Sequence, residues 1–588
     1  RREWGFDGAV ISDWGACTNL TRALQAGMDL EMPDSRGIHK KLLRRDLAAG
    51  KIDPAAIETA AHRVAKLADT YAVEHRKRQK PYDIAHHHSL SVQCAEESAV
   101  LLQNDGILPL KIRQSVAVIG ALAKEMRIQG GGSSHIHTRP LQTAVEALEA
   151  AGLEVHFAPG YTANAAQPNQ ALEQAALDLA QQHQTVLFFG GLTEHFEGEG
   201  YDRKTLQMPK SQLNLVEKIA AVNPNIVFVS FSGAPYDMAF APRVRAILHL
   251  YLAGEGAAEA CAHLLTGQCC PCGKLAESWA KAYSDTPARD NFAGDGRTVQ
   301  YREGLYVGYR YHQTAGVAPA YPFGFGLSYT TFAYADVKAT PQGVSLTVTN
   351  TGDREGAEIV QVYVAKPDAK IFRPAQELKG FAKVQLAAGE SKRVTVALDD
   401  KAFRYWNTLT NAWEVEGGSY EVRVGASCED IRLTAVVTVA GTGAPNPYEG
   451  KSLPHYTSGK VQNVPDAEWE TLLGRPIPDD TVKIDRNMTL GELNHSRSPL
   501  CWLIWLVLHT LLTASYKKGQ PNLNVMFQYN MPLRALAKMT SGAISMGMVD
   551  GIVLEAKGFW VIGLVKVILE AIKNIILNAQ LESRLRNS

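Results

Sequence analysis

A short segment near the start of the chain places a carboxylate beside an indole. Residues 5–14 read GFDGAVISDW, so the apolar run 9–11 leads almost directly to Asp13 and Trp14. A carboxylate here can attack or stabilise an electron-poor anomeric carbon, and a flat indole suits the C–H face of a pyranose. The segment therefore favours sugar chemistry, and the alternative is an Asp that only caps the following helix.

A second group of carboxylates follows a different apolar run. Residues 186–189 are VLFF, and the loop at residues 193–203 reads TEHFEGEGYDR. Its two glycines let the backbone approach a ligand, while Glu197 and Glu199 supply titratable groups. Taken alone, an acidic loop that contains glycine is usually a solvated turn, so a catalytic role needs a second argument.

Both segments resemble the glycoside hydrolases of family 3. REWGFDG at residues 2–8, SDW at 12–14 and AGMDLEMP at 26–33 are similar to the family's nucleophile region. The resemblance implies that Asp13 is the nucleophile at the end of the seventh strand of a (β/α)8 barrel, with Trp14 beside it as a substrate-binding side chain. EGYDR at 199–203 resembles the family's acid/base loop and implies Glu199 as proton donor, with Glu197 as the alternative because loop length varies.

The resemblance implies hydrolysis of terminal non-reducing β-D-glucosyl residues by a retaining mechanism, with a β-glucoside or oligosaccharide as substrate. A β-xylosidase or related exo-glycosidase is the alternative within the class. Asp13 must be ionised and Glu199 protonated, and their carboxyl groups must lie about 5–5.5 Å apart. No cofactor and no metal ion are predicted.

The same resemblance implies that this chain holds only the last two strands of the barrel. A complete barrel has eight strands and at least about 200 residues. We therefore expect a C-terminal portion with little or no glycosidase activity by itself. The alternative from another class is a non-catalytic carbohydrate-binding or membrane-associated assembly.

Composition excludes several other functions. The 588 residues include 60 basic and 60 acidic side chains, a balance that argues against a nucleic-acid partner. The CCPC run at residues 269–272 lacks the second Cys/His pair of a zinc site. The adjacent histidines 86–88 would point about 100° apart on a helix, so they are poorly placed to share one metal ion. The glycine-rich loop at residues 129–135 lacks the Lys-Ser/Thr of a phosphate-binding loop, and the family resemblance places it near the sugar.

Localisation follows only weakly from the sequence. Eight irregularly spaced cysteines favour a reducing compartment and hence the cytoplasm. Because the resemblance places the true N-terminus upstream, the lack of a signal peptide carries no weight.

The predicted architecture is multidomain α/β. Buried apolar runs that alternate with helices predict an α/β sandwich with a mainly parallel sheet, and alternating runs after residue 332 predict antiparallel strands. The expected parts are the barrel end at 1–80, the sandwich at 81–325, a fibronectin type III-like domain at 326–442, a linker at 443–486 and a helical region at 487–588.

The helical region contains two apolar runs, residues 500–508 and 559–577. A membrane span needs about 20 apolar residues. His509 and Thr510 interrupt the first run, and Lys566, Glu570 and Lys573 lie within the second. We expect helices that bury these faces against one another or against a partner subunit, which leaves a homo-oligomer open. Contact with a membrane surface is the less favoured alternative.

Overall fold

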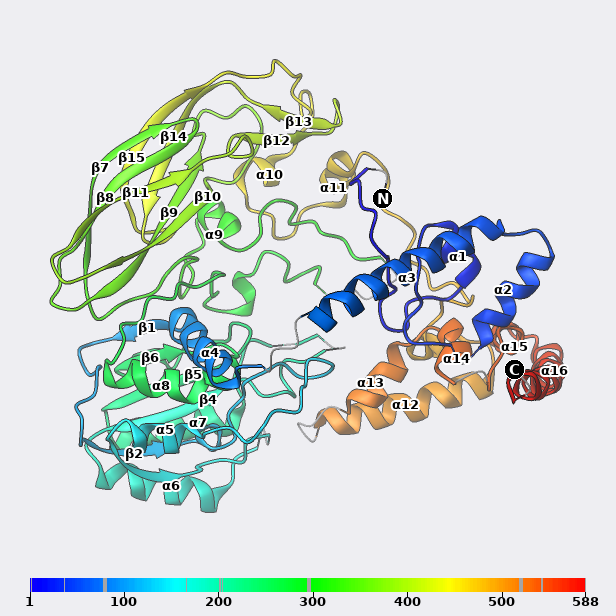
Figure 1. Cartoon of the computed structure of the whole chain (residues 1–588), viewed down its shortest axis with the longest axis horizontal. Helices are drawn as coiled ribbons and strands as arrows, with labels where there is room; N and C mark the ends of the chain where they lie inside the picture. The colour runs from blue at the N-terminus through cyan, green and yellow to red at the C-terminus, as the bar shows by residue number, and fades with distance from the viewer. Residues whose placement is uncertain are drawn as a thin grey trace. The chain divides into compact units, whose positions relative to one another are not determined.

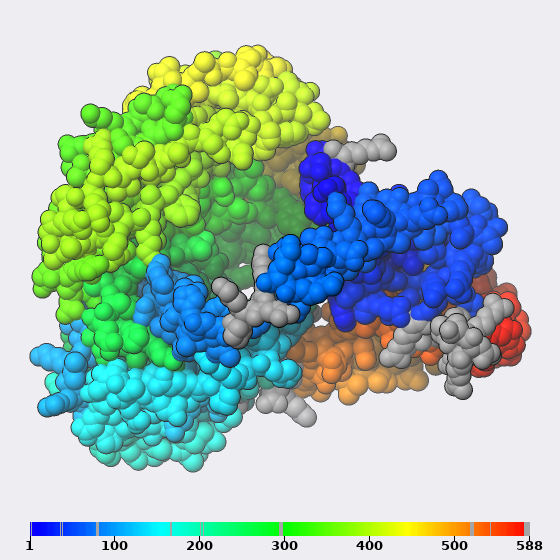
Figure 2. Space-filling view, viewed as in Figure 1, coloured from blue at the N-terminus to red at the C-terminus, as the bar shows by residue number. Residues whose placement is uncertain are grey.

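The computed structural model describes residues 1, 3–35, 37–77, 82–164, 167–199, 202–203, 205–292, 298–517, 522–540 and 543–586. The chain forms two compact units (Figure 1; Figure 2). We call Ile84–Asp480 the central unit, and Arg1–Asp83 together with Thr481–Ser588 the terminal unit. Asp13 belongs to the terminal unit and Glu199 to the central unit.

The central unit is built on a six-stranded sheet. Its strands are β1 (Val100–Asn104), β2 (Ser115–Ile119), β3 (Glu154–Ala158), β4 (Val186–Gly191), β5 (Ile226–Phe231) and β6 (Ala246–His249). They lie in the order β1-β6-β5-β4-β2-β3 and are parallel except for β1, which runs antiparallel to β6. The predicted mainly parallel sheet is therefore confirmed.

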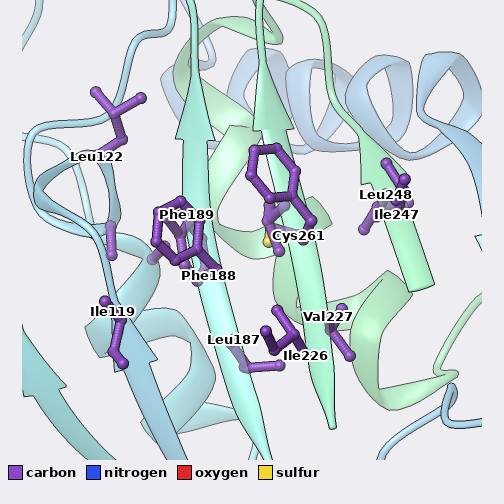
Figure 3. Packing of buried hydrophobic residues seen from close by; sticks show 14 of the residues in the cluster. Ile119, Leu122, Leu187, Phe188, Phe189, Ile226, Val227, Ile247, Leu248 and Cys261 are labelled. Atoms are coloured by element: carbon purple, nitrogen blue, oxygen red, sulfur yellow. The ribbon is translucent and has the colours of Figure 1, made fainter. Parts of the chain in front are cut away.

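Two groups of helices accompany this sheet. α8 (Ala257–Thr266) contacts α4 (Ile84–Ser98) and α5 (Ala144–Ala150), whereas α6 (Gln170–Gln182) contacts α7 (Lys210–Val222). Strands β4, β5 and β6 are buried along their whole length, as expected of strands covered on both faces. Figure 3 labels Phe189 of β4 and Cys261 of α8 among the side chains of this core.

A β-sandwich forms the second part of the central unit. One sheet has the order β10-β9-β14-β15 and the other β11-β8-β7, and all neighbours are antiparallel. The strands are β7 (Phe332–Thr340), β8 (Gly343–Asn350), β9 (Gly356–Ala365), β10 (Glu377–Leu386), β11 (Ser391–Ala397), β14 (Gly418–Gly425) and β15 (Ile431–Val439), with a hairpin of β12 (Arg404–Asn407) and β13 (Ala412–Val415). The segment between Asn350 and Gly356 joins β8 and β9, which lie in opposite sheets.

Residues 443–486, predicted to be a linker, hold two short helices. These are α10 (Pro454–Ser458) and α11 (Asp466–Leu473). Tyr456 of α10 is fully buried and packs in one cluster with Tyr306. The other short helices of the central unit are η1 (Ala121–Ala123), η2 (Ala241–Arg243), η3 (Gly254–Gly256), η4 (Tyr283–Asp285) and α9 (Tyr309–Ala315).

The terminal unit joins both ends of the chain. Its N-terminal helices are α1 (Leu20–Gln25), α2 (Ile38–Ala48) and α3 (Pro54–Lys77). Its C-terminal helices are η5 (Leu490–His495), α12 (Pro499–Lys517), α13 (Leu523–Asn530), α14 (Leu533–Met539), α15 (Met546–Ala556) and α16 (Trp560–Arg586). Lys538 of α14 connects the two parts by donating a hydrogen bond to the Cys17 carbonyl oxygen at 2.9 Å.

Three helices of the terminal unit differ in how their residues are covered or continue. Helix α3 continues through the basic residues near its end to Lys77, and residues 78–80 lie outside the described part. The apolar faces of α12 and α16 remain largely exposed within the described part of this chain, so of the two predicted modes of burial, contact between these helices is not seen there and contact with a partner subunit stays a prediction. Among the described helices, α12 is long and apolar enough to cross a membrane by length and composition, and 6% of its apolar window is buried.

Candidate functional site

Glu199 lies in the loop after β4, against the glycine-rich loop. Its carboxylate accepts a hydrogen bond from the Ser133 backbone N–H at 2.7 Å, and its own N–H donates to the Gly131 carbonyl at 3.3 Å. Hydrogen bonding to Ser133 lowers the pKa of Glu199 below its usual value, and the side chain remains exposed to solvent. The structure thus brings together two loops that the sequence singled out separately.

Glu197 has a different environment from Glu199. Its Oε1 accepts hydrogen bonds from Arg127 Nη1 at 2.5 Å and from the Gly233 N–H at 2.7 Å. Arg127 also donates to the backbone carbonyls of Leu192 and Glu197, at 2.8 and 2.9 Å. Because the Arg127 side chain is only 6% exposed and that of Glu197 15%, this pair fixes the loop. Glu197 therefore anchors the loop through its contacts with Arg127 and Gly233.

Arg203 and Glu277 complete the charged surroundings of this loop. Burial lowers the pKa of Arg203, whose guanidinium donates to the Pro235 carbonyl. Burial also raises the pKa of Glu277 to about 6, an effect that Arg203 opposes and Glu197 increases. Sequence reasoning did not identify Arg127 or Glu277 as members of the site, because neither stands in the loop motif.

Asp13 follows a single parallel bridge between Ile11 and Leu30. The Ser12 N–H donates to the Leu30 carbonyl at 2.9 Å, and Asp13 Oδ1 accepts from the Trp14 N–H at 2.5 Å. The side chains of Asp13 and Trp14 are exposed, that of Trp14 by 72%. The expected strand at residues 9–11 is thus reduced to one bridge.

The two alternatives for Asp13 can be separated by the cap of α1. The N-cap residue of that helix is Asn19, whose side chain accepts a hydrogen bond from the Arg22 N–H at 3.0 Å. The interpretation of Asp13 as a helix cap is therefore wrong. The Asp13 side chain is exposed at the end of a strand-like stretch.

A buried carboxylate holds the segment before Asp13 in place. Asp29 Oδ2 accepts a hydrogen bond from the Val10 N–H at 2.8 Å and pairs with the Arg1 guanidinium. Its other oxygen lies 3.2 Å from Arg63 Nη1 of α3. Two cations and a backbone donor thus fix the DLEMP segment against residues 10–12.

One group of described residues has the composition of a metal site. Ligand atoms of Cys17, Glu31 and His39 all lie within 4.8 Å of one another. However, His39 Nδ1 already binds Glu31 Oε1 at 2.6 Å, and Lys538 Nζ lies 3.7 Å from the same oxygen. Because the protein's own cationic side chain lies beside this carboxylate, we treat the group as a structural contact.

The CCPC run contains free thiols at positions 269, 270 and 272. Burial raises the pKa of the Cys269 thiol to about 12. These thiols are therefore protonated at neutral pH, which disfavours metal binding, since thiolates are the ligands.

Replacing Gly132 by alanine is expected to lower kcat/KM by at least about tenfold. Gly132 has φ +95°, and an added Cβ would lie 2.6 Å from Glu199 Cβ and 2.8 Å from its Oε2. The carboxylate must therefore move. Gly130→Ala is the matched control, because its Cβ would meet only the flexible Ser134 Oγ at 3.1 Å. Steady-state kinetics measures both variants, and an equal decrease in kcat/KM for Gly132→Ala and Gly130→Ala would contradict the prediction.

Comparison with known proteins places these features in a family. A family model described as the glycosyl hydrolase family 3 C-terminal domain matches residues 99–329, and a fibronectin type III-like domain model matches residues 358–428. Thermostable beta-glucosidase B of Acetivibrio thermocellus is 36% identical over 569 residues, 94% of this chain and 70% of that protein. An exo-alpha-(1->6)-L-arabinopyranosidase of Bifidobacterium breve is 41% identical over 464 residues, 76% of this chain and 61% of that protein.

A comparison with solved structures indicates the same family. The crystal structure of a Bifidobacterium adolescentis GH3 beta-glucosidase superimposes with a TM-score of 0.71 at 40% identity, covering 78% of this chain and 69% of that one. The chain spans between 61% and 70% of the length of these three relatives. It belongs to glycoside hydrolase family 3.

Proposed function

We propose that the enzyme hydrolyses terminal β-D-glucosyl residues, and that this chain supplies both reacting carboxylates. Asp13 is the nucleophile and Glu199 the acid/base residue, with Trp14 against the sugar. The single observation that carries the acid/base assignment is the different bonding of the two glutamates. Arg127 and Gly233 occupy the Glu197 carboxylate through hydrogen bonds, whereas Glu199 stays accessible at the loop surface.

The acid role requires the pKa of Glu199 to rise when substrate binds. In the central unit by itself, Ser133 lowers this pKa. A bound sugar removes water from the carboxyl group, and the negative charge of Asp13 would lie across the glycosidic bond. Both effects favour the protonated form, so the resting group becomes a proton donor only in the substrate complex.

The barrel assignment also belongs to this proposal. Residues 1–80 would form the last two strands of a (β/α)8 barrel, with its helices. The parallel Ile11–Leu30 bridge supports this, because α1 lies between the two bridged segments as a crossover helix does. The remaining domain boundaries, 81–325, 326–442, 443–486 and 487–588, are proposed as they were predicted.

The relatives favour β-glucosides, but one observation supports a second candidate. The Bifidobacterium breve relative acts on L-arabinopyranosyl units and is 41% identical. Pentopyranosides, including xylosides, lack the hydroxymethyl group of glucose. A pocket that uses this group discriminates by roughly 10- to 200-fold.

We expect kcat/KM for p-nitrophenyl β-D-glucoside to exceed the values for the β-D-xyloside and α-L-arabinopyranoside by at least about tenfold. The assay compares the chain as it stands with a form extended upstream to supply a complete barrel. A higher kcat/KM for the xyloside or the arabinopyranoside would show that a pentopyranoside, and not a glucoside, is the preferred substrate. Failure to hydrolyse any of the three glycosides would favour a carbohydrate-binding role.

A further inference from the structure

Helix α16 directs its polar residues toward the protein. Lys566 Nζ lies 3.9 Å from Asp550 Oδ2 of α15, and Asn574 Nδ2 donates to the Ala543 carbonyl at 3.1 Å. The helices approach closely where a Cβ on Gly551 would lie 2.6 Å from Val567 Cγ2. The polar and small side of α16 is therefore the side that packs on α15.

The opposite side of α16 is apolar and exposed. Val561, Ile562 and Ile575 are 76%, 63% and 68% exposed. The other members of this face are 48–53% exposed: Leu564, Val565, Ile568, Leu569, Ile572 and Ile576. An amphipathic helix on a soluble surface normally shows the reverse arrangement. A continuous apolar face of this size marks an interaction site.

The spacing of this face matches a helix–helix seam. Val561, Val565, Ile568, Ile572 and Ile575 are separated by alternating steps of four and three residues. This is the a/d repeat that packs knobs into holes between helices. All five are β-branched and have few rotamers, so ordering them costs little side-chain entropy. We call these five residues the α16 seam.

The area and charge of this face fit a second copy of the chain. If all nine exposed side chains of this face were covered, the area removed from water per copy would be on the order of the ~800 Å² per partner of a standard interface. A membrane-surface helix instead carries a basic face toward the lipid headgroups. Here Lys566 faces Asp550, and Lys573 pairs with Glu570 at 2.7 Å.

We infer that the α16 seam is a self-association surface, on which α16 of one copy packs against α16 of a second copy. A symmetric contact of this kind uses the same residues on both partners, so one helix supplies the whole interface. The inference is independent of the proposed catalytic roles, because the seam contains none of the residues assigned to them.

The test is the mass of the chain in solution. Sedimentation velocity across a wide concentration range should give at least twice the chain mass of 64.1 kDa. The double variant Ile568→Lys, Ile575→Lys should weaken association by at least about 100-fold and sediment as the monomer. The control Phe381→Lys, Val436→Lys changes β-sandwich residues of similar exposure, 66% and 65%, and should associate like the native chain.

A second variant keeps the inference testable if the lysine variant misfolds. Ile572 lies near the middle of α16, so parallel and antiparallel pairing both bring two copies of it together. Ile572→Cys should form a disulfide-linked dimer under mild oxidation, whereas Val436→Cys should not exceed the native background. A monomeric native chain, a seam variant that still associates, or flotation of monomers with phosphatidylglycerol vesicles would overturn the inference.

Discussion

Replacing Asp13 by alanine is expected to abolish turnover of p-nitrophenyl β-D-glucoside, lowering kcat by at least about 10⁴-fold. Without this carboxylate no covalent glycosyl-enzyme can form, and water has no activated path to the anomeric carbon. Asp13 is exposed, and its side chain accepts a local hydrogen bond from the Trp14 N–H, so we expect its removal to have little effect on folding. Steady-state kinetics on a form with a complete barrel measures the loss.

Asp7→Ala is the matched control, since Asp7 is also exposed and lies on the same segment. It should keep kcat within about twofold, as surface substitutions usually do. Trapping the enzyme with a 2-deoxy-2-fluoro β-glucoside should add one sugar to the peptide that contains Asp13. A label on another carboxylate would show that the nucleophile is assigned incorrectly.

The sequence correctly predicted strands in which every side chain is buried. Residues 116–119, 186–189, 226–229 and 246–248 are unbroken apolar runs, and each lies in a strand of the central sheet. The pattern works because a strand covered on both faces needs apolar side chains at every position. Residues 9–11 are also apolar, but a parallel strand is stable only beside further strands, and here the pairing stops at one bridge.

Patterns of apolar residues could not predict the contacts that define the candidate site. Ser133 and Glu199 are 66 positions apart, and Arg127 and Glu197 are 70 apart. No periodicity links such pairs, because the sheet topology brings their loops together. A resemblance indicated that both loops approach the sugar, yet only the structure separated Glu197, bound by a buried guanidinium, from Glu199.

The C-terminal helices show a further limit of sequence patterns. The apolar runs correctly predicted helices, but periodicity does not reveal which face of a helix its own chain covers. In α16 the polar positions are used for contacts with α15, as the Lys566–Asp550 pair illustrates. The apolar positions therefore stay exposed, as Val561 and Ile575 show.

Replacing Glu199 by glutamine is expected to lower kcat/KM for an alkyl β-glucoside by about 10²- to 10⁴-fold. Glutamine keeps the shape of the side chain but cannot donate a proton to the leaving oxygen. A 2,4-dinitrophenyl glucoside needs no such proton, so its cleavage should be nearly unaffected and the glycosyl-enzyme should accumulate. Added azide needs no base to attack this intermediate and should restore turnover, with β-glucosyl azide as product.

Glu197→Gln is the control that separates chemistry from loop structure. It removes the charge that Arg127 binds at 2.5 Å, so the loop loosens and Glu199 is misplaced together with it. All substrates should then slow by a similar factor, whatever their leaving group, and azide should not help. If Glu197→Gln instead gave the leaving-group dependence and the azide product, the proton donor would be Glu197. The hydrogen bond from Ser133 would then only hold Glu199 as part of the loop.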